Sequence, residues 1–202
     1  MKSVRPYTIG PDTFKARAVR AEATRRRILD AVVSLLKSRF RPEIRLEDVA
    51  AGAQVTAQTV KNVFGSKSRL LDEALADPLR EVKAQRLRAQ PGEPEAGVAA
   101  LVDHYERLGD LLFRNLAEQA DRELIVAGRD GHRQWVKRQF APQLDRLNAK
   151  RRRLLIDALV CICGVYTWKL YRRDMGRSRS ETEQAILAMV HAIVREAGAA
   201  FS

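Results

Sequence analysis

The sequence predicts an all-α protein: a small N-terminal three-helix unit that contains a helix-turn-helix, followed by a larger C-terminal helical body. Apolar residues recur at intervals of three and four positions along most of the chain, as in amphipathic helices. No segment alternates apolar and polar residues as a half-buried strand does. Glycine and proline mark several of the intervals between the periodic segments. A chain of 202 residues is long enough for a small unit joined to a larger one.

The first helix is expected from about Thr24 to Arg39. Its apolar face is formed by Ile28, Val32, Leu35 and Leu36. Three arginines, Arg25–Arg27, occupy its predicted first turn, where the helix dipole disfavours cations. Cations placed against the helix dipole with no structural benefit indicate a functional role. For Arg25 and Arg26 we expect that role to be contact with phosphate.

Two short helices, over about 46–53 and 57–64, are predicted to flank a tight turn. Thr56 is placed to cap the second of them, and Val60 and Phe64 would face inward. The outward residues of this second helix are Ala57, Gln58, Lys61 and Asn62, with Thr59 at the margin. A helix-turn-helix places its second helix in the DNA major groove. The same residues also fit an ordinary solvated surface, and their place on the second helix is what favours DNA binding.

The net charge of +12 favours an anionic partner, either nucleic acid or an acidic membrane surface. Residues 1–45 contain 12 lysines and arginines against 4 aspartates and glutamates, which is +8, and the other 157 residues carry only +4. The positive charge is therefore concentrated beside the helix-turn-helix. We expect residues 1–20 to form a flexible basic arm, partly helical toward its end, which either contacts DNA or is an ordinary disordered terminus.

The rest of the chain predicts further helices. Ser66 would cap a fourth helix, which contains Pro78 as an expected kink or break. The helices expected after the loop 91–94 span about 94–108, 109–119, 129–147, 149–173 and 180–198. The pattern Ser180-Glu-Thr-Glu183 is typical of a capping box that opens the last helix.

This order of elements resembles the TetR family of transcriptional regulators. The segment Thr24-Arg-Arg-Arg-Ile-Leu-Asp-Ala31 is similar to the opening of the family's first helix. The strongest mark is Val55-Thr-Ala-Gln-Thr-Val-Lys-Asn-Val-Phe-Gly-Ser-Lys-Ser-Arg-Leu70, which is similar to the family's recognition helix and its exit. The match covers about residues 24–75, and beyond them only the helical layout corresponds.

Four residues depart from the family pattern. Gln54 replaces the turn glycine, which would strain a left-handed residue by about 1 kcal/mol. Lys61 and Val63 replace a tyrosine and a histidine that contact phosphate, and of the two only Lys61 retains a group for that contact. Arg45 stands where a serine or threonine often caps the second helix.

The resemblance implies a DNA-binding surface. Thr56, Thr59 and Lys67 would approach the phosphate backbone. Gln58 and Asn62 would contact base edges, because their amides donate and accept hydrogen bonds in the pattern that reads adenine. Lys61 would meet phosphate or guanine.

The resemblance also implies a homodimer that binds a palindromic operator in double-stranded DNA, with helices 149–173 and 180–198 of each chain forming a four-helix bundle. It also implies a repressor that a small-molecule effector releases from its operator. We expect this effector to be apolar, because the helices of the C-terminal body contain few carboxylates or amides. The residues expected to line this ligand site are Tyr105, Leu112, Phe113, Trp135, Phe140, Tyr166 and Trp168. Ordinary core packing also accounts for each of them.

The expected domains are the arm at 1–20, the DNA-binding domain at 21–68 and the regulatory and dimerisation domain at 69–202. Cys161 and Cys163 would point to different sides of a helix, and we expect no disulfide between them and a cytoplasmic protein. No apolar stretch is expected to span a membrane. The three histidines form no metal-binding or nucleophile pattern, so we expect neither metal, cofactor nor enzymatic activity. The alternatives are a regulator without an effector and a basic module that binds membranes or proteins.

Overall fold

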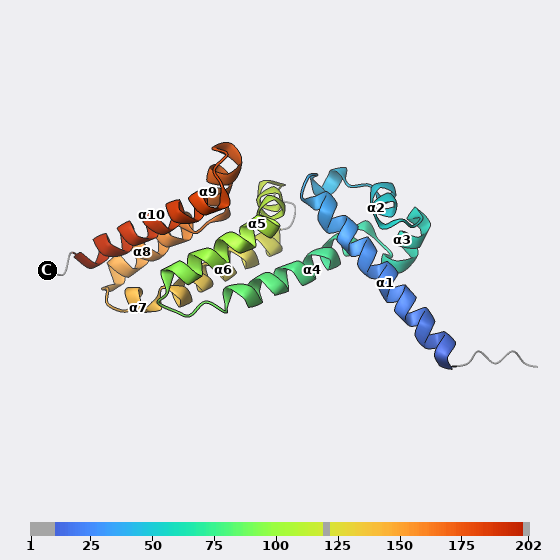
Figure 1. Ribbon diagram of the computed structural model, residues 1–202, viewed down its shortest axis with the longest axis horizontal. Helices are drawn as coiled ribbons and strands as arrows, with labels where there is room; N and C mark the ends of the chain where they lie inside the picture. Colours follow the sequence, from blue (N-terminus) through green and yellow to red (C-terminus); the bar gives the residue numbers. More distant parts are fainter. Residues whose placement is uncertain (1–10, 119–121, 200–202) are drawn as a thin grey trace, which may run out of the picture. The chain divides into compact units, whose positions relative to one another are not determined.

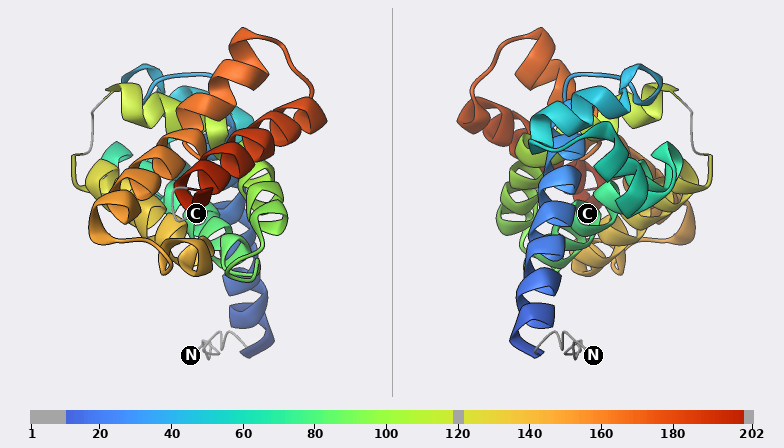
Figure 2. Two further views of the ribbon diagram at one scale, coloured as in Figure 1. Left: turned by 90° about the vertical axis from the view of Figure 1, so that its left-hand side faces the viewer. Right: turned by 90° about the vertical axis from the view of Figure 1, so that its right-hand side faces the viewer.

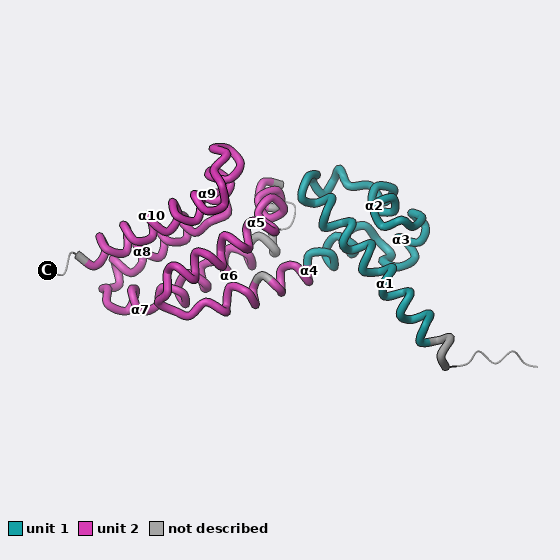
Figure 3. The backbone as a smooth tube through the Cα atoms, viewed as in Figure 1, with its two compact units in different colours: residues 1–75 teal, residues 76–202 magenta. Residues whose placement is uncertain are grey.

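The computed structural model describes residues 11–118 and 122–199, and the regular structure of these ranges is entirely helical (Figure 1). The all-α class predicted from the sequence is thereby confirmed. The chain divides into two compact units, residues 1–75 and 76–202 (Figure 3). The first turns of α4 (Lys67–Arg86) belong to the first unit, because Leu70, Leu71 and Leu75 are buried there.

The first unit is a three-helix core. It contains α1 (Pro11–Leu36), the short 3-10 helix η1 (Arg41–Glu43), α2 (Leu46–Ala53), α3 (Ala57–Phe64) and the start of α4. α1 packs on α2, and α2 packs on α3. The buried side chains of this core include Ile28, Val32, Leu36, Ile44, Val49, Ala50, Ala53, Val60, Phe64 and Leu70. α2 and α3 have the bounds that the sequence predicts.

The start of α1 differs from the prediction. The helix begins at Pro11 instead of Thr24, since proline is favourable in the first helical turn and alanines follow at short intervals. Residues 11–20 are therefore helical, so the helix expected toward the end of the basic arm covers its whole second half, whereas residues 1–10 of that arm lie outside the described residues. Arg25–Arg27 consequently lie in the interior of α1, so the helix-dipole argument for their role does not apply.

The second unit packs long helices around one apolar core. After α4 it contains α5 (Pro94–Glu118), α6 (Arg122–Gln139), α7 (Ala141–Leu144), α8 (Ala149–Ile162), α9 (Val165–Lys169), the π-helical turn η2 (Leu170–Asp174) and α10 (Arg179–Ala199). α10 packs against both α5 and α8, α5 against α9, and α6 against α8 (Figure 2). The core includes Val98, Leu101, Val102, Tyr105, Trp135, Phe140, Leu155, Leu159, Trp168, Ile186 and Val190.

Glycine accounts for two errors in the predicted helix ends. α5 runs through Gly109 as one helix, because this glycine makes room for an indole: a Cβ there would lie 2.6 Å from Cη2 of Trp168. The helix predicted over 149–173 instead breaks at Gly164, which has extended backbone dihedrals and precedes α9. A Cβ at Gly164 would lie 3.1 Å from two carbonyl oxygens, so the tight break favours glycine.

Prolines and a serine account for other differences. Pro78 lies inside α4 without ending it. The helix predicted over 129–147 begins earlier and ends at Gln139, and Pro142 then lies in the first turn of α7. The last helix is capped by Ser178 and not by Ser180: the Glu181 amide donates to Ser178 Oγ (3.2 Å), and the Ser178 amide donates to Glu181 Oε2 (2.7 Å).

One stretch corrects the expectation about apolar runs. By length and composition alone, Ala149–Asp174 is apolar enough to cross a bilayer. It is, however, broken at Gly164, and 33% of its most apolar window is buried inside the protein. Its large exposed apolar side chains are Leu154, Tyr166 and Leu170, and Met175 follows directly. The stretch therefore presents apolar surface outward as well as to the core.

The contact between Gly109 and Trp168 gives a test of the second unit's packing. Gly109→Ala should lower the midpoint of thermal unfolding, because overpacking of about 1–3 kcal/mol outweighs the helix propensity gained. Gly128→Ala in α6 is the matched control, since its Cβ would meet nothing within 4 Å and should raise the midpoint. Equal midpoints for the two variants would contradict this packing.

Candidate functional site

α3 is held so that one face is buried and the other is open. The Thr59 amide donates to Thr56 Oγ1 (3.1 Å), which confirms Thr56 as the cap that begins the helix. Val60 and Phe64 are almost fully buried. A helix of this length is marginal by itself in water, so burial of these two side chains is what holds its opposite face in place.

The turn between α2 and α3 depends on Gln54. Its φ of 55° and ψ of 48° are left-handed, and it is the non-glycine residue with positive φ among those the structure describes. The amide of Val55 donates to the Ala50 carbonyl (2.9 Å), which closes the turn. The left-handed conformation expected at this position is thus present, and a side chain there costs about 1 kcal/mol relative to glycine.

The open face of α3 carries amides, hydroxyls and one ammonium group. Gln58 Nε2 donates to Asn62 Oδ1 (2.7 Å), and the hydroxyls of Thr56 and Thr59 lie 2.9 Å apart. Lys61 is exposed on the same short helix. Side chains of these types can hydrogen-bond to base edges and neutralise phosphate. The structure therefore brings five of the predicted DNA-binding residues together on α3 and its N-cap.

The other three predicted residues lie elsewhere. Arg25 forms an ion pair with Glu73 of α4, and its guanidinium lies 4.7 Å from the ring centroid of Phe64. Arg26 pairs with Asp30 (3.3 Å) on α1. Lys67 Nζ donates to the Pro42 carbonyl (3.1 Å). Arg25 thus has a structural role that sequence reasoning missed, because Glu73 is far from it in the chain.

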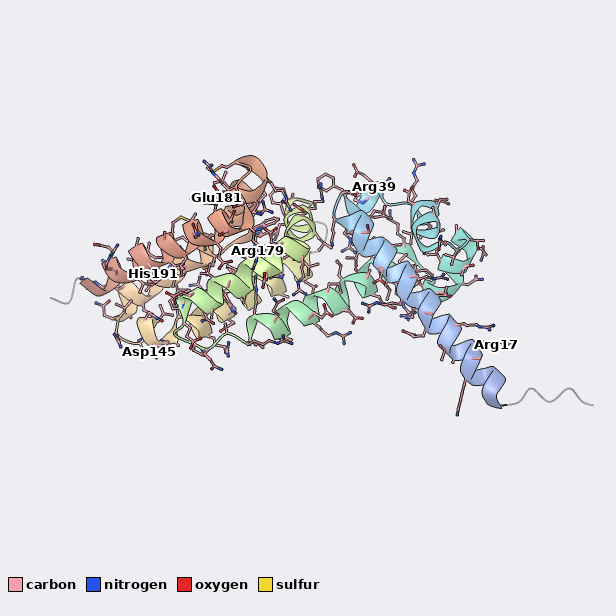
Figure 4. All side chains as sticks on the ribbon, viewed as in Figure 1. Arg17, Arg39, Asp145, Arg179, Glu181 and His191 are labelled. Carbon is pink, nitrogen blue, oxygen red and sulfur yellow. The ribbon has the colours of Figure 1, made fainter. Side chains whose placement is uncertain are left out.

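A further cationic surface follows the exposed part of α1, which extends beyond α2 and α3 (Figure 2). Arg17, Arg20, Thr24 and Arg27 are spaced three or four positions apart and share one face, and Arg27 Nη2 lies 3.4 Å from Thr24 Oγ1. Lys15, Glu22, Arg26 and Asp30 fall on a different, mixed-charge face. We call the first set the α1 arginine stripe (Arg17 is labelled in Figure 4). Helical spacing alone would have found it if the helix had been predicted to begin at Pro11.

The residues predicted to line a ligand site are only partly brought together. Four of them, Tyr105, Trp135, Phe140 and Trp168, are buried in the core of the second unit. Leu112 and Phe113 are partly buried beside that core. Tyr166 is 56% exposed and contacts Phe113 edge-on, with ring centroids 5.7 Å apart. The tyrosine hydroxyl of Tyr105 donates to the Cys163 carbonyl (3.0 Å), and Trp168 Nε1 donates to Glu106 (2.8 Å).

The histidines and cysteines are dispersed. His191 lies 3.0 Å from Glu95, whereas His104 and His132 lie inside the second unit. Cys161 is exposed and Cys163 is buried, as their spacing predicts, and neither forms a disulfide. Burial raises the pKa of the Cys163 thiol to about 12, so it is an unreactive neutral thiol. Within the described residues, no three His, Cys, Asp or Glu side chains are grouped to hold a metal ion.

The strained turn gives a test of this site. Gln54→Gly should raise the midpoint of thermal unfolding, because glycine removes a strain of about 1 kcal/mol in the left-handed region. Gln134→Gly, at an exposed position inside α6, should lower the midpoint by a similar free energy through helix propensity. A lower midpoint for Gln54→Gly would contradict the strained turn.

No protein-family model and no curated protein matches the chain. The structure does match a solved one, described as the crystal structure of a TetR-family transcriptional regulator from Streptomyces coelicolor. The TM-score is 0.66 at 16% sequence identity, and the match covers 88% of this chain and 89% of that one. At this identity the likeness establishes the fold. The chain therefore has the fold of a TetR-family transcriptional regulator, as its resemblance to that family implies.

Proposed function

We propose that this protein is a TetR-family transcriptional regulator that binds a palindromic operator in double-stranded DNA as a homodimer. The observation that carries the proposal is the open face of α3, where Gln58, Lys61 and Asn62 are presented by a helix fixed through Val60 and Phe64. The fold shared with a TetR-family regulator supports it, and so does the concentration of positive charge in residues 1–45.

Dimerisation is proposed because one helix-turn-helix buries too little surface for strong specific binding. The exposed apolar side chains of α8, α9 and η2, at Leu154, Tyr166 and Leu170, would be covered by a second copy. α10 adds apolar residues that are only partly buried in the unit's own core, among them Leu187, Met189 and Ile193. Two such helical pairs would form a four-helix bundle and set two copies of α3 about one turn of DNA apart.

Repression and its release by a small molecule are also part of the proposal. A ligand bound in the second unit would shift the protein toward a form whose two α3 helices no longer match the operator, through its different affinity for the two forms. α4 supports this link, because it is a single helix that contributes residues to both units. A regulator without an effector is the alternative. A protein of this kind would act in the cytoplasm without enzymatic activity.

The proposal is tested by offering sheared genomic DNA to the purified full-length protein and sequencing the bound fragments. Recovery of one motif with two-fold symmetry supports it. Uniform recovery of all fragments would indicate a nonspecific architectural role. Binding to acidic lipid vesicles with no binding to duplex DNA would favour the membrane-binding alternative.

Substitutions on α3 should separate base contacts from phosphate contacts. Gln58→Ala and Asn62→Ala should relax sequence choice at particular base pairs, with a loss of about 1–3 kcal/mol on the selected motif. Lys61→Ala should weaken binding to all sequences and flatten its salt dependence. Titration of motif and scrambled duplexes at several salt concentrations distinguishes these outcomes, and unchanged affinity for all three variants would exclude α3 as the reading surface.

The α1 arginine stripe should contribute phosphate contacts outside the major groove. The double variant Arg17→Ala with Arg20→Ala should reduce the slope of log affinity against log salt by up to about 2 per chain, because each phosphate contact adds about 0.9. The matched control is Lys150→Ala with Arg153→Ala, which removes the same charge from exposed positions of the second unit. Equal changes in slope for the two double variants would show a general charge effect and contradict a contact by the stripe.

A further inference from the structure

A group of polar side chains lies against the aromatic core of the second unit and has no part in the DNA-binding proposal. Arg86 comes from the end of α4, His104 and Tyr105 from α5, and His132 and Trp135 from α6. His104 is 3% exposed and Trp135 is 5% exposed, while Arg86 and His132 are partly buried. We call these five residues the Arg86 cluster.

The Arg86 guanidinium contacts two aromatic rings. Its Cζ is 5.3 Å from the ring centroid of Tyr105 and 5.3 Å from that of Trp135. Its Nη1 lies 3.5 Å from Nδ1 of His132, whose ring stacks on Trp135 with centroids 5.9 Å apart. The guanidinium thus contacts three side chains, none of which carries a negative charge.

His132 is a neutral acceptor in this arrangement. Its Nε2 lies 3.1 Å from the Val160 carbonyl, which can only accept, so the proton is on Nε2 and Nδ1 faces Arg86 with its lone pair. Burial and the Arg86 charge lower the pKa of His132 to about 4, and burial with the neighbouring arginines lowers that of His104 to about 2. Both rings are therefore uncharged at neutral pH, and the positive charge of the cluster resides on Arg86.

Several polar atoms of the cluster are enclosed but unpaired. Arg86 Nε, Trp135 Nε1 and His104 Nδ1 have no hydrogen-bond partner, and the first two can only donate. Over the described residues, carboxylates of this unit pair with other arginines, as Glu106 does with Arg172 and Asp157 with Arg133, and none pairs with Arg86. Buried donors and buried cations are normally matched, so this group of donors lacks an acceptor that carries negative charge.

We propose that the Arg86 cluster is a binding site for a small carboxylate that has an apolar or aromatic body. The guanidinium offers a planar pair of donors that matches a carboxylate, with the indole N–H of Trp135 as a further donor. The rings of Tyr105, Trp135 and Phe140 suit the apolar body. The sequence predicts an apolar effector, and this site adds one carboxylate group to that expected ligand. Only the ligand's role as an effector rests on the proposed function; its binding does not.

The test uses the full-length protein with benzoate as the probe and benzamide as its neutral counterpart of the same shape. Benzoate at millimolar concentration should raise the midpoint of thermal unfolding of the wild type, and benzamide should not. Arg86→Met should abolish the shift and weaken benzoate binding at least tenfold by calorimetry. Without ligand, Arg86→Met should unfold at a higher temperature than the wild type, because it removes a partly buried charge that no carboxylate pairs with.

Arg88→Met is the matched control, because Arg88 is an exposed arginine two residues further along the chain. It should keep the benzoate shift and the wild-type midpoint. Equal effects of benzoate and benzamide, a benzoate shift that persists in Arg86→Met, or a lower ligand-free midpoint for that variant would each overturn the proposal. If Arg86→Met does not fold, calorimetry on Arg86→Gln decides in the same way. No DNA enters this experiment, so its failure and a failure of DNA binding are distinguished.

Discussion

The burial of Phe64 is the constraint on which the DNA-binding surface depends. Phe64 is the last residue of α3, and its ring is almost fully buried in the first unit. The Arg25 guanidinium lies over that ring and pairs with Glu73, so side chains from α1, α3 and α4 meet at one point. α3 is too short to be stable alone, and this contact fixes both its helicity and the direction of its polar face.

The helix-turn-helix could be predicted closely because its signals are local. Thr56 caps α3, Gln54 forms the left-handed turn, and the apolar spacing of Val60 and Phe64 identifies the buried face. Each of these depends on residues within a few positions of one another. The role of Arg25 could not be predicted in this way, since its partner Glu73 is 48 positions away.

The second unit was harder to predict because glycine and proline act there through packing. Gly109 was predicted to separate two helices, yet it lies inside α5 and leaves room for the Trp168 indole. The position of Trp168 is known only from the fold. Gly164 does end a helix, although the apolar pattern continues through it. At the N-terminus Pro11 was expected to lie in a flexible arm that is helical only toward its end, whereas it begins α1 and so extends the basic surface. The choice between these roles depends on tertiary contacts.

The arginines on which the two binding proposals depend have different surroundings. In the first unit, Arg17 and Arg20 are exposed to solvent, where they can contact a large anionic partner such as DNA. In the second, arginines such as Arg172 and Arg173 are matched by Glu106 and Asp110, which holds the pKa of the Glu106 carboxyl below its usual value. Arg86 lies against aromatic rings and a neutral histidine and has no carboxylate partner among the described residues, and this is why a ligand is inferred there and not at the paired sites.

The central claim is that two copies of this chain place their α3 helices in neighbouring major grooves of one duplex. It is tested most directly by measuring the mass of the complex that forms on a fragment recovered from the genome, together with its footprint. The account predicts two chains per duplex and two protected segments whose centres are roughly 10 base pairs apart. One chain per duplex, or no complex at low ionic strength, would contradict it.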